Sequence, residues 1–301
     1  MLNNFELDIL RFFRKISTSF TDAILEFITI FGEQIIIVAI LAFFYFAYNK
    51  NLGKKIAYTL FTSLSLNGAI KGVVSRPRPF VLDPLLSAER VETATGFSFP
   101  SGHTQASSTF FYTTAFYFKK KLLWIFCIVI TILIGFSRIG LGVHYPTDVI
   151  VGMILGILCA IFLSILFDKC IKNFKSELLM YLASFIIFVP FIFIFYSNNY
   201  NKVLIHKDFY QMVMMFGGFI CAFIIDEKLV QFDTNVSLKT KILRLIGAGI
   251  SYVLVDYGLK FIFPKDLFIL SLVRYFLITF VVLGVYPLIF KNILFKKQKK
   301  E

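Results

Sequence analysis

The chain has 301 residues, of which 58% are hydrophobic and 18% aromatic, and its mean hydropathy is +0.79. Soluble domains hold roughly 45–50% apolar residues, so the composition excludes an ordinary soluble protein and indicates an integral membrane protein. The net charge is +13 at pH 7. Most lysines and arginines nevertheless stand in short clusters between apolar runs, which is typical of topology signals and argues against nucleic-acid binding.

The cysteines offer no metal site. Cys127, Cys159 and Cys221 lie inside apolar runs and Cys170 stands beside a lysine, so no CxxC or CxxH spacing exists. We therefore expect no metal, no cofactor and no disulfide, and the sequence implies no protein partner. Residues 1–20 carry several charges without a continuous apolar core, which argues against a cleavable signal peptide.

The first predicted element covers residues 1–33. Apolar positions such as Phe5, Ile9 and Phe12 recur there at helical spacing among charged residues. This pattern predicts an amphipathic helical segment at the membrane interface, although an ordinary packing helix would have the same pattern. Treating residues 16–32 as a further span would leave almost no connection before the next apolar run, so we prefer the interfacial interpretation.

Nine apolar runs then follow, each about long enough to cross ~30 Å of hydrocarbon. They predict an all-α fold, a polytopic transmembrane helical bundle of about nine spans. We divide it into a core at residues 34–170 and additional C-terminal helices with a basic tail at residues 171–301. The predicted spans are 34–49, 55–74, 102–118, 122–140, 147–167, 178–196, 209–225, 242–262 and 267–290.

Loop charges predict the orientation of these spans. Cationic clusters follow the first, third, fifth, seventh and last runs, and cytoplasmic loops carry an excess of lysine and arginine. The C-terminus is therefore predicted to lie in the cytoplasm, and the alternate loops to face the extracytoplasmic side of the inner (plasma) membrane. The clusters include Lys50, Lys54, Lys55, Lys119, Lys169, Lys228 and Arg244.

Three polar clusters fall in the alternate loops. In the first, Lys71 ends a predicted span and Arg78 stands between two prolines, which disfavour helix and extend the chain. The two cations can thereby approach one anion from different directions, and a guanidinium suits the paired oxygens of phosphate. The alternative is that both cations merely reach to the interface from the ends of spans.

The second cluster is Pro100-Ser101-Gly102-His103, at the start of the run 102–118. Ser101 is a good helix N-cap and Gly102 lets the backbone approach a ligand closely, so the helix start can form an anion cradle. His103 adds a titratable nitrogen that suits protonation of a leaving oxygen. A purely structural histidine is the alternative.

The third cluster runs from Arg138, at the end of the run 122–140, to Asp148. Pro146 is a favoured first helical residue, so Asp148 falls in the first turn of the next helix. From there its carboxylate can reach back four residues to His144, fix the tautomer and leave the other nitrogen free to attack. Asp148 would otherwise serve only as a helix cap. Arg138 adds a further cation.

Together the clusters resemble the three-part signature of the type 2 phosphatidic acid phosphatase superfamily, over roughly residues 30–167. The matching residues are Lys71-x6-Arg78-Pro79, Pro100-Ser101-Gly102-His103 and Ser137-Arg138-x5-His144-x3-Asp148. The resemblance implies that His144 attacks phosphorus, that Asp148 orients it and that His103 protonates the leaving group. It implies that the phosphoryl oxygens are held without a metal, by Lys71, Arg78, Ser101, Gly102 and Arg138.

We therefore predict an integral-membrane phosphatase that hydrolyses a lipid phosphate or diphosphate through a phosphohistidine, with membrane lipids around it. Undecaprenyl diphosphate is the preferred substrate, because the site faces outward and Arg76 and Arg90 add positive charge for a second phosphate. Phosphatidic acid and phosphatidylglycerol phosphate are alternative substrates, and a lipid phosphotransferase would use the same intermediate. An anion transporter would explain the cations but not the two histidines with an aspartate.

Outside the signature, Asp256 and Arg274 lie within or near the last two predicted spans. Charged side chains in such segments usually pair with one another. We therefore expect these two residues to form an ion pair.

Overall fold

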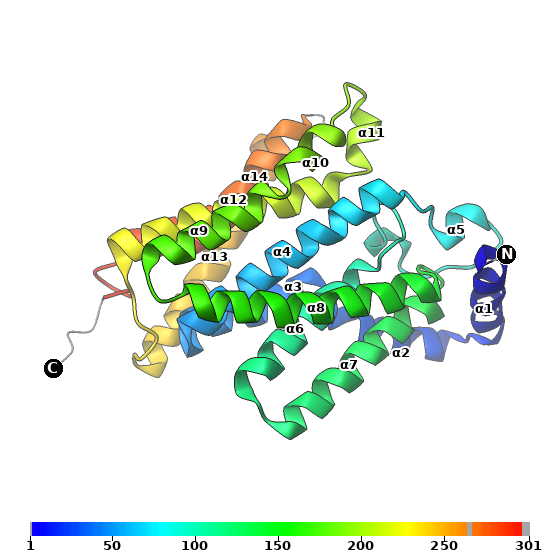
Figure 1. Ribbon diagram of the computed structural model, residues 1–301, viewed down its shortest axis with the longest axis horizontal. Helices are drawn as coiled ribbons and strands as arrows, with labels where there is room; N and C mark the ends of the chain where they lie inside the picture. Colours follow the sequence, from blue (N-terminus) through cyan, green and yellow to red (C-terminus); the bar gives the residue numbers. More distant parts are fainter. Residues whose placement is uncertain (1, 264–266, 297–301) are drawn as a thin grey trace. The chain divides into compact units, whose positions relative to one another are not determined.

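The computed structural model describes residues 2–263 and 267–296, and within these ranges the chain forms helices and loops without a strand (Figure 1). The predicted all-α class is confirmed. The helices are α1 (Leu2–Ile16), α2 (Ser19–Ile30), α3 (Gln34–Phe43), η1 (Phe44–Tyr48), α4 (Lys50–Val74), α5 (Pro79–Leu82), η2 (Val91–Thr93), α6 (Gly102–Phe118), α7 (Lys121–Gly140), α8 (Pro146–Cys170), α9 (Phe174–Ile186), α10 (Val189–Ile194), α11 (Tyr200–Leu204), α12 (Lys207–Ile225), η3 (Asp226–Val230), α13 (Leu238–Ile262), α14 (Phe268–Phe280), η4 (Val281–Val285) and α15 (Tyr286–Ile289).

Six helical segments among the described residues are long and apolar enough to cross a membrane, so the predicted number of nine spans is not confirmed. The first of them includes α2, which the sequence pattern placed in the interfacial segment 1–33. The boundaries of that segment, and those of 34–170 and 171–301, stay predictions. The six segments are Ser19–Tyr48, Lys121–Gly140, Pro146–Cys170, Phe174–Ile194, Leu238–Ile262 and Phe268–Ile289.

The chain divides into two compact units. The first contains the described residues up to Val38 together with Ser63–Ser164 and Ser197–Phe209, and the second contains Ala39–Thr62, Ile165–Tyr196 and the described residues from Tyr210 onward. All three polar clusters of the sequence belong to the first unit.

In the first unit, α7 packs against α1, α2 and α6 (Figure 1). Two glycines of α8 bring its backbone against α6: a Cβ at Gly152 would lie 2.7 Å from the Ser101 carbonyl oxygen, and one at Gly156 would lie 2.6 Å from that of Gln105. Small residues allow such close approach of helix backbones. The start of α6 is further tied to α8 because the Ser101 N–H donates to the Asp148 carbonyl at 2.9 Å. The helices that carry the second and third clusters therefore have a fixed spacing.

In the second unit, the lysines at the start of α4 are partnered by acidic side chains. Lys54 is buried, with its Nζ 2.9 Å from Glu177 Oε1, and Lys50 forms an ion pair with the buried Asp226. These lysines were predicted as loop charges, but the folded chain holds them in ion pairs. Burying a charge is costly unless it is paired in this way.

Four further charged residues of the second unit have partners. The predicted pair forms between α13 and α14, where Arg274 Nη1 lies 3.5 Å from Asp256 Oδ1. This prediction is confirmed, and Lys260 also lies close to the same carboxylate, with Nζ 2.6 Å from Asp256 Oδ2. Arg244, counted above among the topology signals, is buried and donates Nε–H to the Leu294 carbonyl at 2.8 Å.

Candidate active site

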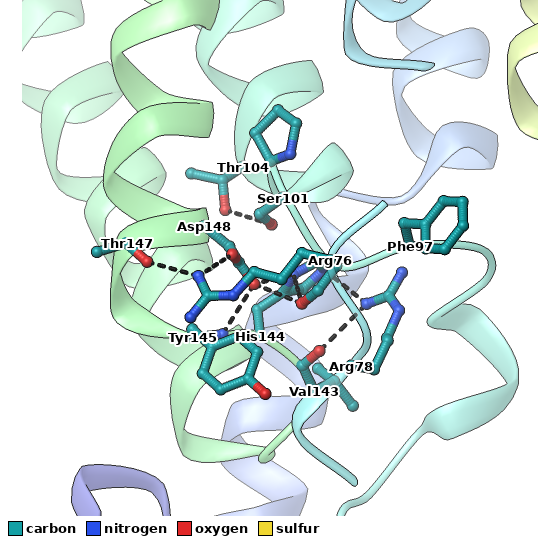
Figure 2. A network of polar contacts seen from close by, with 12 residues as sticks. Arg76, Arg78, Phe97, Ser101, Thr104, Val143, His144, Tyr145, Thr147 and Asp148 are labelled. Carbon is teal, nitrogen blue, oxygen red and sulfur yellow. Dashed lines mark hydrogen bonds and ion pairs between the residues drawn. The ribbon is translucent and has the colours of Figure 1, made fainter. Parts of the chain in front are cut away.

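His144 and Asp148 come together at the junction of α7 and α8 (Figure 2). α7 ends at Gly140, and the N–H of His144 then folds back to the Arg138 carbonyl at 3.3 Å. Because α8 starts at Pro146, Asp148 lies in its first turn, where its Oδ2 is 3.3 Å from His144 Nδ1. The four-residue spacing read from the sequence thus places the carboxylate against the imidazole.

The partners of the imidazole define its tautomer. Arg78 Nη1 lies 2.9 Å from His144 Nε2, and a guanidinium can only donate. Nε2 therefore carries the lone pair, and Nδ1 carries the proton that faces Asp148. Burial lowers the pKa of His144 well below its usual range, and the positive charges of Arg78, Lys71 and Arg138 act in the same direction. The imidazole is neutral at physiological pH.

Backbone carbonyls of the loop before α6 accept hydrogen bonds from both Lys71 and Arg78, in addition to the contact between Arg78 and His144. Lys71 Nζ donates to the Phe97 carbonyl at 2.5 Å, while Arg78 donates to those of Thr95 at 2.5 Å and Gly96 at 3.1 Å. Burial lowers the pKa of Arg78 to about 10, so the guanidinium is still charged at neutral pH. An anion entering the site can replace these neutral acceptors.

Arg138 is fully buried on α7 and keeps one donor, Nε–H, without an acceptor among the described residues. Its Nη1 donates to Thr29 Oγ1 at 3.0 Å and its Nη2 to Thr93 Oγ1 at 3.5 Å. Together with Lys71 and Arg78, it is one of three cations whose charge acts on His144.

The second cluster forms the start of α6, with one departure from expectation. Ser101 occupies the N-cap position, but its side chain makes no capping bond and instead accepts a hydrogen bond from Thr104 Oγ1 at 2.9 Å. A Cβ at Gly102 would meet only Asn67 Oδ1, at 3.6 Å, so the protein leaves room beside this backbone. His103 Nε2 is buried and lacks a hydrogen-bond partner within the described ranges.

Arg76 and Arg90 do not serve as the free cations that we predicted for a second phosphate. Arg76 Nη1 lies 2.8 Å from Asp148 Oδ1, and its Nη2 lies 2.6 Å from Glu6 Oε2. Arg90 forms an ion pair with Glu33. Both guanidinium charges are already compensated by carboxylates, so neither residue is the uncompensated cation that this expectation requires.

The sequence patterns did not predict three residues of the site, Ser98, Thr147 and Glu6. Ser98 Oγ donates to Asp148 Oδ2 at 2.5 Å, and Thr147 Oγ1 donates to Glu6 Oε1 at 2.7 Å. Ser98 could have been found, since a buried carboxylate needs donors and Ser98 is a polar residue beside the second cluster. Glu6 carried no local signal, because it reaches the site only through the docking of α1.

Within residues 2–263 and 267–296, no group of three or more histidine, cysteine, aspartate or glutamate side chains could hold a metal ion. A site without metal stays a prediction, to be tested by chelation.

Comparison with known proteins places the clusters in a family. The model of the PAP2 superfamily matches residues 52–172, and the model of the PAP2 superfamily phosphatase transmembrane extension matches residues 210–298. The first match contains all three polar clusters.

Three relatives carry different names. Undecaprenyl-diphosphatase BcrC of Bacillus subtilis is 30% identical over 52% of this chain and 79% of its own length. Phosphatidylglycerophosphatase B of Bacillus subtilis is 35% identical over 38% of this chain, and the lipid A 1-phosphatase of Rhizobium johnstonii is 30% identical over 41%. The matches span 58% and 51% of the lengths of these last two proteins. The resemblance drawn from the motifs is confirmed, and the chain belongs to the PAP2 superfamily.

Proposed function

We propose that this membrane-embedded protein is a phosphatase that hydrolyses a lipid phosphate or diphosphate through a phosphohistidine on His144. The observation that carries the proposal is the pairing of the two imidazole nitrogens: Nδ1 faces Asp148 at 3.3 Å and Nε2 faces Arg78 at 2.9 Å. A neutral imidazole held in this tautomer by a carboxylate is a nucleophile, and the guanidinium marks where the attacked phosphoryl group binds.

The reaction follows from these positions. The phosphoryl oxygens replace the loop carbonyls as partners of Lys71 and Arg78, and Arg138 neutralises further charge. His144 Nε2 attacks phosphorus, so the P–N bond forms while the bond to the leaving oxygen breaks. His103, in the protonated form that the negative charge of the bound phosphate favours, gives that oxygen its proton. Water then attacks the phosphohistidine, His103 takes a proton from it, and inorganic phosphate leaves. Asp148 stabilises the positive charge on the imidazole in the intermediate.

We propose undecaprenyl diphosphate as the substrate, with phosphatidylglycerol phosphate and phosphatidic acid as alternatives. The support is the similarity to a protein named undecaprenyl-diphosphatase, of which this chain covers 79%. The similarity to phosphatidylglycerophosphatase B favours the alternative. Arg76 and Arg90 no longer support a diphosphate, since both are in ion pairs.

The purified protein in detergent should release phosphate from lipid substrates, with EDTA present as well as absent, because cationic side chains take the place of a metal.

We expect kcat/KM for undecaprenyl diphosphate to exceed that for phosphatidic acid by about tenfold, or ~1.4 kcal/mol in transition-state stabilisation. Equal rates would remove the diphosphate proposal. If the protein in liposomes carried anions across the membrane but released no phosphate from lipids, the transporter would be the correct function and the phosphatase proposal would be wrong.

The acid limb of the pH profile should lie below pH 6.5, the ordinary pKa of histidine. Protonation of Nε2 removes the attacking lone pair, and a lowered pKa moves that protonation to more acidic pH. Activity is therefore expected to persist through pH 6.5 and to fall only as pH drops further, through the pKa of folded His144. The measurement is kcat/KM across the acid range, where a midpoint above pH 6.5 would contradict the tautomer and burial described here.

We also propose that the site faces the extracytoplasmic side of the inner membrane and that the C-terminus is cytoplasmic, as the loop charges predict. Ser87 and Asn51 are both exposed and lie in loops or helix ends predicted to face opposite sides. Cysteine at position 87 should react with an impermeant thiol reagent in intact cells, and cysteine at position 51 only after lysis. The parent protein serves as control for its own four cysteines. Labelling of position 51 in intact cells, and of position 87 only after lysis, would show that the orientation is opposite to the one proposed.

A further inference from the structure

A continuous chain of charged side chains leads from α1 to the candidate nucleophile. Glu6 Oε2 lies 2.6 Å from Arg76 Nη2, Arg76 Nη1 lies 2.8 Å from Asp148 Oδ1, and Asp148 Oδ2 lies 3.3 Å from His144 Nδ1. Glu6 and Asp148 are buried, and Arg76 is largely so. Figure 2 shows Arg76 between Thr147 and Asp148, with its guanidinium over the Tyr145 ring at 3.7 Å from the ring centroid.

Glu6 also fixes the first turn of α8. Its Oε1 accepts hydrogen bonds from the Thr147 N–H at 2.9 Å and from Thr147 Oγ1 at 2.7 Å, and the same hydroxyl accepts from Arg76 Nη1 at 2.7 Å. A carboxylate at a helix N-terminus is favoured by the exposed N–H groups and by the helix dipole. The carboxylate of α1 therefore holds both the guanidinium and the helix that carries Asp148.

α1 is held against the site by contacts besides Glu6. Leu7 and Leu10 are buried in one cluster with Leu86 and Tyr145, the residue that follows His144. At the other end of the helix, Arg14 Nη1 lies 2.6 Å from Asp22 Oδ1. The position of Glu6 is therefore set by packing on both sides and does not depend on Arg76 alone.

We propose that Glu6 and Arg76 are positioning residues for the reaction, so that α1, which precedes the part of the chain matched by the family model, belongs to the catalytic apparatus. This inference rests on the proposed role of His144. Asp148 Oδ1 is fixed by Arg76, which leaves Oδ2 aimed at His144 Nδ1. Without the guanidinium, the carboxylate would lose both a hydrogen-bond donor and the charge that compensates its burial.

The first test uses Arg76→Gln and Glu6→Gln in the full-length protein. In Glu6→Gln, the amide NH₂ must face either Arg76 Nη2 or the Thr147 N–H, and both are donors. We expect kcat and the rate of phosphohistidine formation to fall roughly tenfold, a loss typical of a misplaced reacting group. KM should stay within about twofold, because Lys71, Arg78 and Arg138 are untouched. Arg76→Lys, which keeps the charge, should recover part of the loss.

Asp256→Asn is the matched control, since it breaks an arginine–carboxylate pair of similar burial, Arg274–Asp256, in the second unit and outside the chain to Asp148. It should leave kcat unchanged. If it lowers kcat as much as Glu6→Gln does, or if the Glu6 and Arg76 variants raise KM without lowering kcat, the positioning role is overturned. Thermal melting in detergent checks that each variant is folded.

Two further variants keep the test decisive. Thr147→Val removes only the hydroxyl between Glu6 and Arg76, and is expected to lower kcat about threefold even if Glu6→Gln does not fold. The double variant Glu6→Gln/Arg76→Gln should lose no more than about threefold beyond Arg76→Gln alone, because both act through Asp148. If the loss of kcat in the double variant equalled the product of the two single losses, Glu6 and Arg76 would act independently and not both through Asp148. Catalytic activity that survives in His144→Ala would refute the proposed function itself. Full activity of the Glu6 and Arg76 variants would refute only this inference.

Discussion

Replacing His144 by alanine is expected to reduce the rate of phosphate release by a factor on the order of 10⁵ or more, as for other covalent nucleophiles. Among the described residues, His144 is the histidine that has a carboxylate against one nitrogen and an arginine against the other. The remaining cations can bind the phosphoryl group but cannot attack it. Steady-state phosphate release with the preferred lipid measures this loss.

The matched control is His206→Ala, which removes a histidine of the same compact unit that has no role in the proposed reaction. It should keep activity within about threefold, as expected for a substitution outside the reacting groups. An acid-labile phosphoenzyme should form on the parent protein and on His206→Ala, but not on His144→Ala. More than a trace of turnover by folded His144→Ala would refute the assignment of the nucleophile.

The second large effect is expected for Asp148→Asn, with a loss of roughly 10³–10⁴-fold in kcat, the size typical when a histidine loses its orienting carboxylate. Oδ1 accepts from Arg76 at 2.8 Å, and Oδ2 accepts from Ser98 Oγ at 2.5 Å and from the Tyr145 N–H at 3.0 Å. Whichever way the amide turns, its NH₂ group faces a donor. The asparagine therefore cannot hold His144 Nδ1–H as the carboxylate does.

Asp83→Asn provides the comparison for this variant. Asp83 is also a buried carboxylate that accepts from an arginine, Arg11 Nε, at 2.8 Å, but it has no contact with His144. It should keep kcat within about threefold, since it lies outside the reacting groups. Equal losses in the two variants would indicate that Asp148 matters for stability and not for orienting the imidazole.

The local parts of the site could be predicted from the sequence because short-range rules set them. A proline at the first helical position and a spacing of four residues suffice to place Asp148 against His144. The partners of Lys71 could not be predicted, because the carbonyls that accept from it depend on the path of a loop before α6. Arg76 was misread for a related reason: its carboxylate partner Glu6 comes from α1, and nothing local indicates where α1 docks.

The fold class was predictable for a similar reason, since long apolar runs determine helices. The number of spans was not, because length and hydropathy do not separate a span from a helix that hides polar groups inside the protein. α6 shows this: it has 17 residues and carries a row of buried serines and threonines between Thr104 and Thr114. Arg244 likewise looked like a loop charge, although its guanidinium is buried against backbone carbonyls.

The ion pairs at the start of α4 have a consequence for the order of events during synthesis. Lys50 and Lys54 pair with Asp226 and Glu177, which are translated much later. While the first spans enter the membrane, both lysines lack these partners and act as full positive charges on the insertion machinery. Only when the later helices pack are the same lysines neutralised. A lysine whose charge is neutralised by an ion pair in the mature protein can thus act on the orientation of the nascent chain.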